Sequence, residues 1–99
     1  MRYCVIGEKL THSMSPQIHK EYFDYYKIDG SYGIEQIPMQ DMLSGDCAQT
    51  LLGYDGFNVT VPYKEKVMKY LAGISAEAKA IGAVNTVVNS SGSLYGYNT

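Results

Sequence analysis

The sequence has no tryptophan and only two cysteines among its 99 residues. Cys4 lies in a short apolar run and Cys47 in a polar stretch, so the pair forms neither a disulfide framework nor a zinc-binding pattern. Such sparse cysteine usage is typical of a reducing compartment. We therefore expect the protein to be cytoplasmic.

Long apolar runs and tracts of a single charge are also missing. No apolar segment approaches membrane-spanning length, and the run Tyr3–Ile6 passes directly into Gly7, unlike a secretion signal. Ten acidic and eight basic residues leave a formal charge of -2, with the signs interspersed. We expect neither a membrane nor nucleic acid as a partner.

Several cofactor and catalytic motifs are absent as well. The sequence contains no G-x-G-x-x-G and no G-x-x-x-x-G-K-[ST], so it shows no recognisable dinucleotide or nucleoside triphosphate site. No G-x-S-x-G surrounds a serine, which disfavours a serine hydrolase. His12 and His19 lack the i, i+4 spacing of a helical metal pair. We expect this chain to hold no metal and no cofactor.

What is present is the composition of a globular protein, with 45% hydrophobic and 18% charged residues. The length suits one small domain, at residues 1–99, without internal repeat or linker. Short β-prone runs alternate with segments of helical periodicity. Strands are predicted at 3–6, 31–37, 56–61, 83–89 and 93–97, and helices after Ser15, after Pro38, after Pro62 and from Ser75 to Ile81.

This alternation predicts an α/β fold, a three-layer α/β/α domain with a mainly parallel sheet and a C-terminal β-hairpin. Ligands of such sheets bind beyond the carboxyl ends of the strands. The loops after Ile6 and Val59 would share that edge if their strands are parallel neighbours. These two loops hold the most unusual residues of the sequence.

The first motif, His12-Ser13-Met14-Ser15-Pro16, places two hydroxyl groups at a predicted helix start. Free N–H groups and the helix dipole favour an anion there, such as a carboxylate. The same pattern also fits a Ser15 that only caps its helix while Ser13 lies in solvent.

The second motif runs from Asn58 to Lys64. Pro62 predicts a helix start and puts Lys64 in the first turn, where the dipole opposes its charge and favours release of a proton. Lys64 is therefore our candidate general acid/base. The alternative is a solvated lysine, and composition alone does not separate Lys64 from Lys66.

The third motif, Gly82 to Val88, contains Asn85 within a run that otherwise resembles a buried strand. A buried amide needs hydrogen-bond partners. Either substrate hydroxyls or a neighbouring loop would supply those partners. The same two alternatives apply to Asn58.

The stretches that overlap these motifs, His12–His19, Gly56–Lys64 and Ile81–Thr86, resemble the N-terminal substrate-binding domain of the shikimate dehydrogenase family. Val5-Ile6-Gly7 and the ending Gly96-Tyr97-Asn98-Thr99 extend the resemblance. The resemblance covers essentially the whole chain, in the family's order. It implies NADPH-dependent reduction of 3-dehydroshikimate to shikimate, in aromatic amino acid biosynthesis. It also implies a separate Rossmann domain for NADP in the complete enzyme, which this sequence lacks.

The family pattern implies that Ser13 and Ser15 bind the substrate carboxylate and that Lys64 is the catalytic lysine. In the family, an aspartate that works with this lysine follows the final Asn-Thr pair, and this sequence stops before it. The substrate-binding residues that we predict are Ser13, Ser15, Asn58, Thr60, Lys64, Asn85 and Thr99.

We therefore expect a half-enzyme that binds shikimate or 3-dehydroshikimate weakly, binds no NADP and turns nothing over. One alternative is a folded fragment that mainly self-associates through apolar surface left without its partner domain. Another is half of a dehydrogenase that uses quinate, because quinate-using relatives share these motifs.

Overall fold

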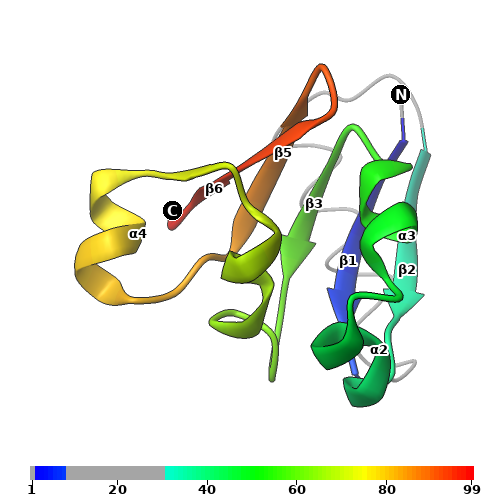
Figure 1. Cartoon of the computed structure of the whole chain (residues 1–99). Helices are drawn as coiled ribbons and strands as arrows, with labels where there is room; N and C mark the ends of the chain where they lie inside the picture. The colour runs from blue at the N-terminus through cyan, green and yellow to red at the C-terminus, as the bar shows by residue number, and fades with distance from the viewer. Residues whose placement is uncertain (1, 9–30) are drawn as a thin grey trace.

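The computed structural model describes residues 2–8 and 31–99. These residues form a six-stranded mixed sheet with the strand order β2-β1-β3-β5-β6-β4 (Figure 1). The strands are β1 (Arg2–Gly7), β2 (Ser31–Gln36), β3 (Gly56–Val59), β4 (Gly73–Ile74), β5 (Thr86–Ser90) and β6 (Ser93–Tyr97). The helices are α2 (Met39–Ser44), α3 (Ala48–Leu52), the 3-10 helix η1 (Lys66–Tyr70) and α4 (Ala76–Ile81).

The strand pairing confirms the predicted α/β class. Strand β1 lies between β2 and β3 and is parallel to both, and β4 is parallel to β6. The pairs β3–β5 and β5–β6 are antiparallel, the latter forming the predicted hairpin. The helix predicted after Ser15, which would contribute to a second helical layer, lies outside the described residues.

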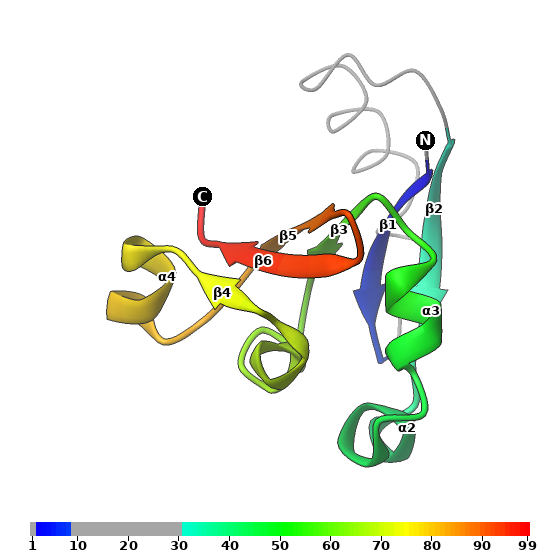
Figure 2. The ribbon, with the colours of Figure 1, turned by 45° about the horizontal axis from the view of Figure 1, so that its top comes forward.

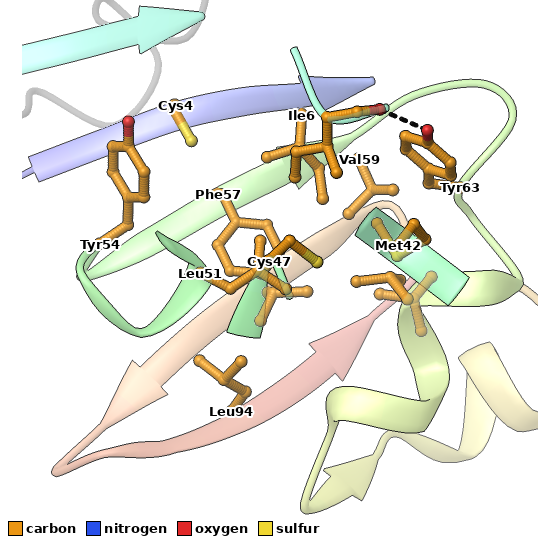
Figure 3. Packing of buried hydrophobic residues seen from close by; sticks show 14 of the residues in the cluster. Cys4, Ile6, Met42, Cys47, Leu51, Tyr54, Phe57, Val59, Tyr63 and Leu94 are labelled. Atoms are coloured by element: carbon orange, nitrogen blue, oxygen red, sulfur yellow. Dashed lines mark hydrogen bonds between the residues drawn. The ribbon is translucent and has the colours of Figure 1, made fainter. Parts of the chain in front are cut away.

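The core lies on one face of the sheet because alternate strand residues point to that face. Cys4 and Ile6 of β1 pair with Phe57 and Val59 of β3, and all four side chains are buried (Figure 3). Val87 continues this face on β5. The period of two thus separates an apolar face from a second face that carries Asn58.

Short helices cover the apolar face. Helices α2 and α3 lie beside β1 and β2, and α4 lies beside β4 at the far end of the sheet (Figure 2). Met42 of α2, Leu51 of α3 and Val67 of η1 are fully buried in the core. The hydroxyl of buried Tyr63 donates to the carbonyl of Ile37, which ties the segment before η1 to the segment before α2.

The capping residues in the sequence predict both ends of α4 correctly. The Oγ of Ser75 accepts from the Ala78 N–H at 3.2 Å, as expected of an N-cap, and Gly82 ends the helix with φ of 82°. The strand predicted over 56–61 ends earlier, at Val59. The two-residue strand β4 was not predicted, because its pairing with β6 leaves almost no local signal.

The helix predicted directly after Pro62 is wrong in its start. Residues 61–62 and 64–65 form turns, and the following element is a five-residue 3-10 helix that begins at Lys66. Tyr63 is completely buried within this turning segment. The backbone before Lys66 is shaped by the burial of the Tyr63 side chain in the core, and the helix therefore starts later than Pro62 predicts.

None of the helices in the described ranges is long and apolar enough to cross a membrane.

Candidate functional site

The candidate site is the edge of the sheet where β1 and β3 end. Ile6 and Val59 are paired neighbours in these parallel strands, so the condition for the two loops to share this edge is met. Thr60 follows β3 directly, and its N–H donates to the Ile6 carbonyl at 3.0 Å. This bond holds Thr60 at the edge, where its side chain is half-buried.

Lys64 reaches the same region through its backbone. Its carbonyl accepts a hydrogen bond from the Val84 N–H at 2.8 Å, which brings it next to the segment that precedes β5. The Lys64 side chain is exposed. Because Lys64 precedes η1, the argument from a dipole in the first helical turn is wrong, and Lys66 occupies the helix start instead.

Asn85 lies immediately before β5 and is half-buried, so the prediction that it interrupts a buried strand is wrong. Its backbone still bridges two strands. The Asn85 N–H donates to the Tyr97 carbonyl at 3.0 Å, and the Asn85 carbonyl accepts from the Val59 N–H at 2.9 Å. The residue is thereby held between the ends of β3 and β6.

The side chain of Asn85 has protein partners. Its Nδ2 donates to the Thr99 carbonyl at 3.1 Å, and its Oδ1 accepts from the Thr99 N–H at 3.1 Å. Oδ1 also accepts from the hydroxyl of Thr86 at 3.0 Å. Protein groups therefore supply partners for this amide, and they bring Thr99 to the site.

Asn58 is buried on β3 and faces away from the apolar core. Its Nδ2 donates to the Oγ1 of Thr86 at 3.5 Å. Thr86 thus contacts both candidate amides, a role that we did not predict from the sequence. Its position next to Asn85 in the third motif was the only available signal.

The described candidate residues, namely Asn58, Thr60, Lys64, Asn85 and Thr99, belong to segments that hydrogen bonds join at this edge of the sheet. Ser13 and Ser15 lie outside the described residues. Within the described ranges, no group of three or more His, Cys, Asp or Glu side chains is placed to hold a metal ion. The groups at this edge are hydroxyls, amides and one ammonium, which suit a small polyhydroxylated or anionic ligand.

An α/β sheet with polar groups at the carboxyl edge of its parallel strands is typical of domains that bind small molecules. Residues 5–87 match the family model of the shikimate dehydrogenase substrate binding domain. The chain belongs to this family.

Individual relatives support the same assignment. The chain is 48% identical over 97 residues to shikimate dehydrogenase (NADP(+)) of Clostridium beijerinckii, covering 98% of this chain and 36% of that protein. The crystal structure of shikimate dehydrogenase 1 from Peptoclostridium difficile superposes with a TM-score of 0.82 at 53% identity, over 99% of this chain and 36% of that one.

A third similar structure is that of shikimate 5-dehydrogenase from Thermus thermophilus in complex with shikimate. It has a TM-score of 0.80 and 36% identity, and the match covers 99% of this chain and 38% of that one. This chain therefore spans little more than a third of the length of these relatives.

Proposed function

We propose that this chain is the shikimate-binding part of an NADP-dependent shikimate dehydrogenase, which interconverts 3-dehydroshikimate and shikimate. The observation that carries the proposal is the gathering of Thr60, Lys64, Asn85 and Thr99 at one edge of the sheet, in a chain that matches this family over residues 5–87. The relative from Thermus thermophilus, whose structure contains shikimate, supports the choice of ligand.

The chemistry of the side chains assigns each a role. The Thr60 hydroxyl and the Asn85 amide supply neutral hydrogen bonds, which suit ring hydroxyls or a carboxylate. The exposed Lys64 ammonium supplies a charge and a transferable proton, so it would exchange a proton with the substrate oxygen at the carbon that is reduced. We retain Ser13 and Ser15 as proposed ligands of the substrate carboxylate, on the family pattern alone.

NADP is the cofactor named for the relatives. The residues of this chain do not fit a dinucleotide site, because the sequence has no G-x-G-x-x-G and each described helix has only five or six residues. We therefore assign no NADP-binding residue here. We expect the chain alone to bind substrate weakly and to turn nothing over.

The test is a titration of the isotope-labelled chain with shikimate, followed by NMR of the backbone amides. We expect saturable shifts centred on Thr60, Lys64 and Asn85. A folded spectrum that does not respond to shikimate would overturn the proposal that this chain binds it. A parallel titration with quinate separates the two substrate classes, since a quinate-using protein would bind quinate at least as tightly.

A matched pair of variants ties the binding to the proposed edge. Thr60→Val removes one hydroxyl and leaves the backbone hydrogen bonds of residue 60 in place. Thr50→Val makes the same change on the exposed surface of α3. We expect Thr60→Val to weaken shikimate binding several-fold and Thr50→Val to leave it unchanged, whereas equal affinities would remove Thr60 from the site.

Self-association is a second candidate, and exposed apolar side chains favour it. Val88 pairs with Tyr95 across the hairpin, and Tyr97 lies on the same face, with 39–44% of each side chain exposed. Apolar surface of this kind promotes contact between copies. Sedimentation over a concentration series tests the idea, and a monomer at every concentration would refute it.

A further inference from the structure

We propose that Thr86 is a positioning residue that fixes the side-chain amides of Asn58 and Asn85 in the orientation that substrate binding requires. This inference rests on the proposed function, in which those two amides belong to the substrate site. Thr86 itself need not touch the substrate. Its hydroxyl would act through the two asparagines.

The strand register places Thr86 between these amides. Asn58 of β3 and Thr86 of β5 are directly opposite each other in the antiparallel pair. Side chains opposite each other in such a pair lie on the same face. Because the neighbouring Val87 points into the core, Thr86 and Asn58 point to the other face, toward the candidate site.

The Thr86 hydroxyl makes one hydrogen bond as a donor and one as an acceptor. A threonine has one proton to donate and lone pairs with which to accept. The Thr86 hydroxyl donates to Asn85 Oδ1 at 3.0 Å and accepts from Asn58 Nδ2 at 3.5 Å. The nitrogen of Asn58 therefore faces Thr86, as the oxygen of Asn85 does. A flip of the Asn85 amide would take its oxygen away from the Thr86 proton and would set its NH2 group against the Thr99 N–H.

The orientation of Asn85 leaves a donor for a ligand. Its Oδ1 accepts from the Thr86 hydroxyl, from the N–H of Thr99 and, at 3.4 Å, from the Thr99 hydroxyl. One of the two Nδ2 protons goes to the Thr99 carbonyl, which is the only acceptor for this group among the described residues. The second Nδ2 proton is then presented to an acceptor on the substrate, such as a hydroxyl or carbonyl oxygen.

Two substitutions at Thr86 separate the effect of its hydroxyl group from the effect of the shape of its side chain. Thr86→Val keeps the β-branched side chain favoured in a strand but removes the donor for Asn85 and the acceptor for Asn58. Thr86→Ser keeps the hydroxyl and removes only a methyl group. Thr50→Val, on the surface of α3, controls for the general effect of replacing a hydroxyl by a methyl.

The experiment measures two quantities on the isotope-labelled 99-residue chain, the order parameters of the side-chain NH2 groups of Asn58 and Asn85 and the Kd for shikimate. In Thr86→Val we expect lower order at both amides and a Kd about tenfold higher, the equivalent of one net hydrogen bond. Thr86→Ser should restore both quantities to within about twofold of the starting chain, and Thr50→Val should change neither.

The outcomes distinguish this inference from the proposed function. If the unsubstituted chain binds shikimate and Thr86→Val has the same Kd, the inference is overturned while the proposed function stands. Unchanged amide order in Thr86→Val, or a failure of Thr86→Ser to restore the Kd, also overturns it. If the unsubstituted chain binds no shikimate, the proposed function fails, and the role of Thr86 in orienting the substrate fails with it.

Discussion

The side chain of Asn85 pairs with the backbone of Thr99 much as one strand pairs with another. Its Nδ2 donates to the Thr99 carbonyl and its Oδ1 accepts from the Thr99 N–H, both at 3.1 Å. A second amide, Asn98 Nδ2, donates to the Ala83 carbonyl at 3.1 Å. The two asparagines hold the residues after β6 against the segment before β5, so Thr99 stays at the candidate site although it is exposed.

We expect Asn85→Ala to release Thr99. Both backbone groups of Thr99 lose their partner, so its backbone order parameter should fall below about 0.6, the range of flexible backbone. NMR relaxation of the labelled chain measures this. Asn89→Ala is the matched control, because Asn89 Nδ2 bonds the carbonyls of Leu52 and Tyr54 and not the residues after β6. The control should lower stability and leave Thr99 ordered.

In a complete enzyme that carries this chain, Lys64→Met should lower kcat by about 10²–10⁴, the usual contribution of a general acid/base. The Kd for shikimate should rise much less, because several other groups contribute to binding. Steady-state kinetics and a binding titration provide the two numbers. Lys66→Met is the control, because Lys66 is the exposed neighbouring lysine at the start of η1. Its kcat should stay within about twofold of that of the unsubstituted enzyme. Equal losses of kcat in both variants would refute a special role for Lys64.

The elements that could be predicted from the sequence are those with local signals. The N-cap at Ser75 and the glycine at position 82 mark the ends of α4, and the apolar run 3–6 marks β1. The sequence analysis left the pairing of β1 with β3 as a condition, and the structure shows that the two strands are parallel neighbours. Local chemistry and core formation agree in these elements.

Features that depend on non-local contacts could not be predicted in this way. The delayed start of η1 reflects the burial of Tyr63 against Ile37, a contact between residues 26 positions apart. The bonds from Asn85 to Thr99 join residues 14 positions apart. Thr86 carries no signal of its own, because an Asn-Thr pair in a β-prone run is common in any sheet protein.

The packing around Gly96 predicts a large loss of stability in Gly96→Ala. A Cβ on residue 96 would lie 2.5 Å from the Leu71 Cδ1 and 2.9 Å from the Val84 Cγ2. Overpacking of this kind costs about 1–3 kcal/mol of unfolding free energy, which urea denaturation measures. Gly33→Ala is the control, because a Cβ at residue 33 on β2 meets no atom of the described residues within 4 Å. A loss of equal size in both variants would contradict the packing argument.

The environment of Cys4 predicts a loss of stability in alkali. Burial, aided by the negative charge of Glu35, raises the pKa of the Cys4 thiol from 9.0 to about 12. Because this pKa is higher in the folded chain than in the unfolded one, the stabilisation is complete below about pH 9 and is lost as the pH rises toward 12. Urea denaturation at a series of pH values should show this decline.

Burial also raises the pKa of Tyr63 and raises that of Tyr70 to about 12, so these tyrosines contribute to the same decline in stability. The variant Cys4→Ala isolates the contribution of the thiol. Cys4→Ala should be less stable at neutral pH, since it leaves a cavity in the core. Its unfolding free energy should nevertheless fall less steeply above pH 9, because one fewer group ionises on unfolding. Parallel curves for the two chains would show that the thiol does not contribute.

The same burial should keep Cys4 unreactive toward a thiol reagent at pH 8 until urea unfolds the chain, since the thiolate is the reacting species.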